Sequence, residues 1–164
     1  MNRRVASLAA GLSLILIVLT GCWTPAPKAL YSEGLNWTLE APGALVLDAE
    51  TTNGSISISG WENETVTVDA WKEVRAYTEA EAEEFAREVK VQVQQEGDTI
   101  RVFKEHRKPP KGINVSVRYE IQAPKTIEPR LRTTNGSVRV YEIEAPISAQ
   151  STNGSVEPKM SNMV

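Results

Sequence analysis

Two kinds of side chain in this chain could do acid–base or nucleophilic chemistry: paired carboxylates and a single imidazole. Cleavage of a glycosidic bond needs two carboxylates a few ångströms apart, one with a raised pKa. The best pair is Glu142 and Glu144, which we expect at i and i+2 on one face of a strand. A Ser-His-Asp arrangement would have to use His106, the sole histidine, which lies in a basic segment rich in proline. Solvated surface positions explain these residues better, so a glycan-active enzyme stays a remote alternative and we expect no catalytic residue.

Metal, cofactor and nucleic-acid chemistry find little support in the composition. One histidine and one cysteine are too few for a zinc or copper site. Calcium could use carbonyls of Asn53 or Asn135, but no Asp-rich loop accompanies them. The net charge of −3 argues against a phosphate-binding face. The basic run at 104–111 either contacts anionic lipid or wall phosphates or is a solvated loop, and its two prolines favour the loop. We expect no metal, no cofactor and no nucleic-acid partner.

The single cysteine, Cys22, follows a typical export signal. Arg3 and Arg4 precede an apolar run from Val5 to Leu19, which is shorter than the roughly 20 residues that span a bilayer as a helix. The run ends in Leu19-Thr20-Gly21-Cys22, which resembles the lipobox of bacterial lipoproteins. The resemblance implies cleavage before Cys22 and a diacylglycerol thioether on its sulfur. An ordinary signal peptide or an uncleaved anchor is the alternative.

This export signal divides the chain into three parts. Residues 1–21 are the predicted signal peptide, 22–35 a tether rich in proline and small polar residues, and 36–164 a β domain. Because the signal carries two of the 18 basic side chains, its removal would shift the net charge to about −5. We expect an exported protein that its N-terminal lipid anchors to the bacterial cell membrane or the outer membrane.

The tetrapeptide Thr-Asn-Gly-Ser occurs three times and organises the β domain. Its Asn-Gly pairs are Asn53-Gly54, Asn135-Gly136 and Asn153-Gly154, the last two 18 residues apart. Asn-Gly favours tight turns, because both residues tolerate positive φ. Apolar residues alternate with polar ones on both sides of each copy, which is the strand period. The copies therefore predict corners of a stacked β architecture, with independent hairpins as the alternative.

The spacing of apolar residues departs from the strand period in one segment of the chain. Thr78 and Glu81 form a capping box, and the apolar residues Ala82, Phe85, Ala86 and Val89 follow at helical spacing. Strand alternation returns at Val91. We therefore predict a mainly β fold, a β-solenoid-like stack of short strands with one inserted amphipathic α-helix.

The corners, the segment 45–56 and the strand 119–124 resemble the bacterial putative-adhesin domains of unknown function, also called toastrack domains, which carry Thr-x-Asn-Gly repeats on a β-solenoid. The likeness covers about Asn36 to Val156. It implies a secreted or tethered protein, with no shared catalytic residue to carry over. Pro158 is expected to interrupt the last strand, and we expect a shortened molecule whose open terminal rung favours self-association.

We therefore interpret the chain as a non-enzymatic, lipid-anchored envelope protein, an adhesin or interaction scaffold for a protein or a cell-wall polymer. The alternative is an envelope-stress sensing module that binds a membrane protein. Trp61 is the aromatic residue we select for stacking on a sugar, although packing over a sheet edge is its commoner fate.

Overall fold

The computed structural model describes residues 29–43 and 45–159, which form eleven strands and one helix. In chain order these are β1 (Ala29–Glu40), β2 (Val46–Asn53), β3 (Ile56–Trp61), β4 (Thr65–Ala76), α1 (Glu79–Glu88), β5 (Lys90–Glu96), β6 (Thr99–Glu105), β7 (Asn114–Pro124), β8 (Glu128–Asn135), β9 (Val138–Tyr141), β10 (Ser148–Asn153) and β11 (Val156–Lys159). The predicted signal peptide, Cys22 and the first part of the tether lie outside the described residues. None of the described helical structure reaches the length and hydropathy that a membrane crossing needs.

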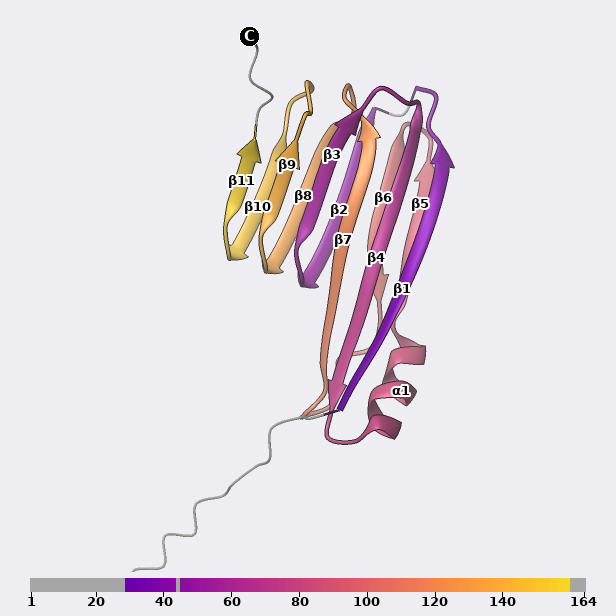
Figure 1. Cartoon of the computed structure of the whole chain (residues 1–164), viewed down its shortest axis with the longest axis vertical. Coiled ribbons are helices and arrows are strands. Elements are labelled where there is room, and N and C mark those ends of the chain that lie inside the picture. The colour runs from indigo at the N-terminus through magenta and orange to yellow at the C-terminus, as the bar shows by residue number, and fades with distance from the viewer. Residues whose placement is uncertain (1–28, 44, 160–164) are drawn as a thin grey trace, which may run out of the picture.

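The strands form two stacked sheets (Figure 1). One has six strands in the order β1-β4-β7-β3-β9-β11, and the other has five in the order β10-β8-β2-β6-β5. Each Asn-Gly corner carries the chain from the five-stranded sheet to the six-stranded one, so that β2–β3, β8–β9 and β10–β11 are three successive rungs. The rungs stack in parallel with their corners aligned, Asn53 against Asn135 and Asn135 against Asn153. The predicted solenoid-like stack is confirmed, and the hairpin alternative is wrong because the strands flanking a corner belong to different sheets.

Hydrogen bonds between neighbouring rungs explain why asparagine and glycine recur at the corners. The Asn135 side-chain amide donates to Asn53 Oδ1 at 2.7 Å, and Asn153 repeats the contact to Asn135 Oδ1 at 2.9 Å. Glycine is required because the rungs touch: a Cβ on Gly136 would lie 2.1 Å from the Gly54 carbonyl oxygen. The expectation of positive φ at both corner residues holds only at two of the glycines, with φ of 134° at Gly54 and 155° at Gly136, and not at Gly154 or the corner asparagines.

The other end of the stack is antiparallel and carries the helix. β4 pairs antiparallel with both β1 and β7, and β5 pairs antiparallel with β6. The predicted capping box is present, since Thr78 accepts from the Glu81 backbone N–H and the Glu81 carboxylate accepts from that of Thr78. The apolar side of α1 packs on the long strands β1 and β4, where these extend beyond the five-stranded sheet.

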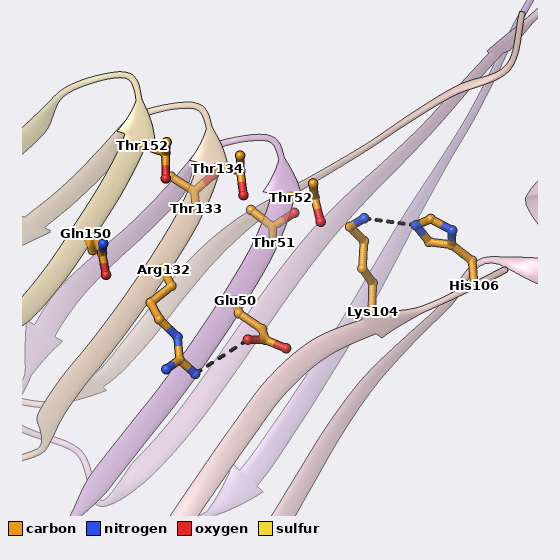
Figure 2. A pocket seen from close by; sticks show the side chains of 10 residues that line it. All are labelled: Glu50, Thr51, Thr52, Lys104, His106, Arg132, Thr133, Thr134, Gln150 and Thr152. Atoms are coloured by element: carbon orange, nitrogen blue, oxygen red, sulfur yellow. Dashed lines mark hydrogen bonds and ion pairs between the residues drawn. The ribbon is translucent and has the colours of Figure 1, made fainter. Parts of the chain in front are cut away.

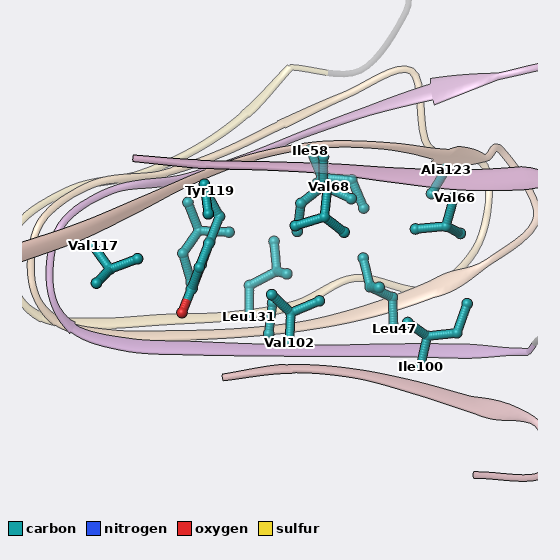
Figure 3. Close-up of a cluster of buried hydrophobic side chains, with 14 of the residues drawn as sticks. Leu47, Ile58, Val66, Val68, Ile100, Val102, Val117, Tyr119, Ala123 and Leu131 are labelled. Carbon is teal, nitrogen blue, oxygen red and sulfur yellow. The ribbon is translucent and has the colours of Figure 1, made fainter. Parts of the chain in front are cut away.

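Aliphatic side chains from both sheets fill the interior (Figure 3). Leu47 and Ile100 from the five-stranded sheet face Ile58 and Val68 from the six-stranded sheet, all of them fully buried. The largest buried side chain, Tyr119 of β7, is an exception to this apolar filling because its hydroxyl group has no hydrogen-bond partner among the described residues. Burial raises the pKa of Tyr119 above its ordinary value of 10.0, and the charge of Glu50 raises it further.

We expect Tyr119→Phe to raise the free energy of unfolding by about 1 kcal/mol, because a buried hydroxyl without a partner is costly. Because its pKa is raised, the Tyr119 hydroxyl stays protonated in the folded state at a pH where it ionises in the unfolded chain. The free energy of unfolding of the native protein should therefore fall as the pH rises above 10.0. It should fall less steeply in the variant. Urea denaturation between pH 7 and pH 11 measures both effects. A variant less stable than the native protein at neutral pH would contradict this account.

Three expectations from the sequence need correction. The predicted tether at 22–35 is wrong from Ala29 onward, because β1 begins there and pairs with β4 along its whole length. The expected interruption at Pro158 is also wrong, because β11 continues through it. An edge strand tolerates proline where the missing backbone N–H would point away from the neighbouring strand. Glu142 and Glu144 are not on a strand but in the exposed connection between β9 and β10, and Glu142 has a φ of 53°.

Candidate functional site

A column of threonines runs across the outer face of the five-stranded sheet, next to the corners. Because side chains alternate along a strand, the residue before each Thr-Asn-Gly-Ser copy points inward and the threonine that begins the copy points outward. The inward residues are Thr51, Thr133 and Ser151. The hydroxyls of Thr133 and Ser151 donate to carbonyls of the preceding rung, and that of Thr51 donates to the Val117 carbonyl of β7. The parallel register aligns the outward residues of three strands into one column: Thr52, Thr134 and Thr152.

This column lines a groove of about 500 Å3 (Figure 2). A second row, one pleat further from the corners, contributes Glu50, Arg132 and Gln150. Lys104, near the end of β6, and His106, just after it, form the opposite wall. The groove is therefore a strip of hydroxyl, amide and charged groups built from four neighbouring strands and one loop. We call it the threonine groove.

Opposite charges are balanced within the threonine groove. The Arg132 guanidinium lies 3.2 Å from Asp48 Oδ1 and 3.5 Å from Glu50 Oε2. Lys104 is half-buried, and this burial lowers the pKa of its ammonium group, while the nearby Glu50 charge acts in the opposite direction. The groove thus offers cationic donors without a strong excess of either sign.

Both ring nitrogens of His106 are engaged in hydrogen bonds. Nδ1 lies 2.6 Å from the Arg107 carbonyl oxygen, which can only accept, so Nδ1 carries the proton. Nε2 is then free to accept from the Lys104 ammonium group at 3.0 Å. In this arrangement His106 orients Lys104 rather than activating a nucleophile.

The other residues selected from the sequence are dispersed. The corner residues, Asn53, Gly54, Asn135, Gly136, Asn153 and Gly154, build the edge of the stack beside the groove and do not line it. Trp61 is half-buried at the end of β3 and donates its indole N–H to the Thr65 carbonyl oxygen at 2.9 Å. Within the described ranges, no group of three His, Cys, Asp or Glu side chains could hold a metal ion. The sequence analysis missed the groove, although the outward position of the threonine in each Thr-Asn-Gly-Ser copy follows from alternation alone.

These features define a class of protein: a β-solenoid-like scaffold with a polar groove on one face. No family model matches the chain, and no curated protein matches it. Some solved structures match the chain, each with a TM-score below 0.5. A structure described as a putative adhesin from Bacteroides fragilis gives a TM-score of 0.47 at 12% identity, over 84% of this chain and 57% of that one.

Two further solved structures give comparable values. A putative cell adhesion protein from Clostridium sporogenes gives a TM-score of 0.42 at 11% identity, over 77% of this chain and 59% of that chain. A putative adhesin from Parabacteroides merdae gives 0.40 at 7% identity, over 82% and 54%. The chain thus spans little more than half the length of each of these proteins.

Proposed function

We propose that this protein is a non-enzymatic, lipid-anchored scaffold of the bacterial envelope that binds an extended, hydroxyl-rich cell-wall polymer along the threonine groove. The observation that carries the proposal is the column of Thr52, Thr134 and Thr152, which repeats one polar group at the spacing of adjacent strands. At the surface of a cell such a scaffold would act as an adhesin, which is the role that the sequence resemblance implies.

A regular column suits a regular ligand. Adjacent strands lie about 4.8 Å apart, so the three hydroxyls offer donors and acceptors at a short, constant interval. An extended glycan presents its own hydroxyls repeatedly along one direction and can engage several of them at once. The groove exposes more polar than apolar surface, which disfavours an acyl chain or an apolar peptide as its ligand.

The walls of the groove favour a polymer with anionic substituents. Arg132 already has two carboxylate neighbours, whereas Lys104 contacts the neutral ring of His106 and keeps further N–H donors available. A carboxylate or phosphate on the polymer would give Lys104 a direct ion pair, whereas Glu50 acts on it only through its nearby charge.

Sedimentation of the purified full chain with protease-treated cell-wall sacculi tests the groove. We expect the double substitution Thr134→Val and Thr152→Val to weaken binding by about tenfold or more, because two hydroxyls are lost and the shape of the side chains is kept. Thr38→Val is the matched control, since Thr38 is an exposed threonine on β1 in the other sheet. Equal binding by the double variant and the control would disprove the proposal. Loss of a membrane-protein partner in the double variant, without any sacculus binding, would favour the sensing module instead.

The lipid anchor has a separate test. Mass spectrometry of the protein purified from bacterial membranes should find a mature N-terminus at Cys22 that carries diacylglycerol, and Cys22→Ser should release the protein from the membrane fraction. Two acyl chains give a stable anchor where one gives only marginal binding. A free thiol on membrane-bound protein would exclude this anchor and leave the groove proposal unaffected.

A further inference from the structure

The five-stranded sheet opens beside the first corner. β2 and β6 pair in parallel only as far as Ala49 and Val102, yet β2 continues to Asn53 and β6 to Glu105. Beyond the last pair the two strands separate, as Figure 2 shows at one side of the threonine groove. We call the opening between β2 beyond Ala49 and β6 beyond Val102 the fork.

Two polar side chains of the fork belong to the inner face of the sheet. Lys104 follows the buried Ile100 and Val102 at steps of two residues, so alternation places it on the inward face of β6. Thr51 is the inward residue of β2 at the corresponding level. Both line the groove, because the sheet opens between them. An ammonium group and a hydroxyl group are thus reached through the fork.

β7 of the six-stranded sheet lies behind the fork. The Thr51 hydroxyl donates to the Val117 carbonyl oxygen at 3.0 Å, and the Asn53 side-chain amide donates to the Val115 carbonyl oxygen at 3.1 Å. A step forward along β2 is therefore a step backward along β7. The two strands face each other across the interior and run in opposite directions.

Tyr119 lies at the base of the fork. One more step of the same kind places Tyr119 of β7 against Ala49, the last residue of β2 that pairs with β6. Figure 3 shows the Tyr119 ring crossing the interior, with its hydroxyl group at the side that the five-stranded sheet closes. The charge of Glu50 acts on both the Tyr119 hydroxyl and the Lys104 ammonium group, which agrees with their lying near one another.

The groups that meet at the fork are hydrogen-bond donors. Among the described residues, the fully buried Tyr119 hydroxyl has no partner. Lys104 contacts Nε2 of His106 and keeps two further N–H groups to donate. A buried donor without an acceptor is costly, so the fork favours a ligand group that only accepts. Glu50 would repel an anion, but its carboxylate already lies 3.5 Å from the Arg132 guanidinium.

We infer that the fork is a binding site for an oxyanion substituent, a carboxylate or a phosphate, and that Tyr119 is a specificity-determining residue of this site. The inference rests on the proposed function, since the substituent belongs to the polymer in the threonine groove. One oxygen atom would accept from Lys104 and another from Tyr119. Because the Tyr119 hydroxyl is fully buried, the substituent must move a side chain to reach it, and Lys104 has the long, flexible stem that allows this.

Small molecules test the fork without the polymer. N-Acetylmuramic acid carries a carboxylate and glycerol phosphate a phosphate, while N-acetylglucosamine and glycerol are their neutral counterparts. Titration into the full chain with isotope-labelled tyrosine should give saturable NMR shift changes at Tyr119 with at least one of the two acids and with neither neutral compound. The acid that responds identifies the substituent. Tyr77, which is exposed, should not respond.

Three variants of the full chain separate binding from folding. Tyr119→Phe should bind the acid about fivefold more weakly or worse, because one hydrogen bond is lost, although we expect this variant to be the more stable protein. Lys104→Met should weaken binding about tenfold or more, because a charged donor is lost. Tyr77→Phe is the matched control and should bind like the native protein.

Equal affinity of the native protein and Tyr119→Phe would overturn the inference, because water would then satisfy the hydroxyl. Equal binding of the acids and their neutral counterparts, or no saturation, would also overturn it. Sacculus binding without binding of either acid would remove the fork and leave the proposed function in place. Binding of an acid without sacculus binding would support the fork and remove the polymer.

Discussion

Gly54→Ala should lower the free energy of unfolding by about 3 kcal/mol or more, the largest loss that we expect from any single added methyl group. The new Cβ would lie 2.1 Å from the carbonyl oxygen of Val117, a backbone atom of a strand that is paired on both sides. Alanine would also be forced to a φ of 134°. Steric overlap and backbone strain therefore act together, and urea denaturation followed by circular dichroism measures their sum.

Gly97→Ala separates these two contributions. Gly97 has a φ of 58° in the turn between β5 and β6, and nothing lies within 4 Å of its added Cβ. In this control the free energy of unfolding should fall only by the cost of the left-handed conformation, about 1 kcal/mol. If both variants lost the same free energy of unfolding, the close contact between Gly54 and β7 would not be the reason for glycine at this corner.

Lys72→Met should detach the helix from the sheet. Lys72 points inward from β4, and its ammonium group donates to the Ala86 and Val89 carbonyl oxygens at the end of α1, at 3.0 and 3.2 Å. It also forms an ion pair with Glu33 at 2.5 Å. Methionine keeps the length of the side chain but leaves these buried acceptors unpaired. We expect the free energy of unfolding to fall by about 2 kcal/mol. Breaking a fully buried ion pair would cost more, but Glu33 is partly exposed to solvent.

Hydrogen exchange of the backbone amides shows which elements lose stability in Lys72→Met. The amides of α1 should exchange faster in Lys72→Met, while those of β2 and β8 should change little, because the rungs pack without the helix. Lys90→Met is the matched control, since Lys90 is exposed at the start of β5. Uniformly faster exchange throughout the chain would show that Lys72 supports the whole core and not the helix alone.

Local signals in the sequence account for the parts of the fold that were predicted. The Asn-Gly copies and the capping box of Thr78 and Glu81 each act through neighbours within a few residues, so their geometry follows from residue type. The stack was predictable for the same reason, since successive motif copies agree at several positions and hairpins would need only Asn-Gly.

Long-range pairing accounts for the parts that were missed. The first part of β1, residues 29–35, was assigned to a tether because of its glycine and polar residues, yet it pairs with β4, where Gly34 lies opposite Trp71. The threonine groove needs β6 beside β2, so that Lys104 lies next to Glu50 and Thr52 at one side of the groove. No local pattern states that order of strands.

The constant step between the last two corners also has an evolutionary consequence. Asn135 and Asn153 are 18 residues apart, and each donates its side-chain amide to the asparagine of the preceding rung. Duplication in tandem of one such unit would add one strand to each sheet and disturb no existing loop. If the protein binds a polymer along the threonine groove, as we propose, the number of units would set how much of that polymer the groove contacts.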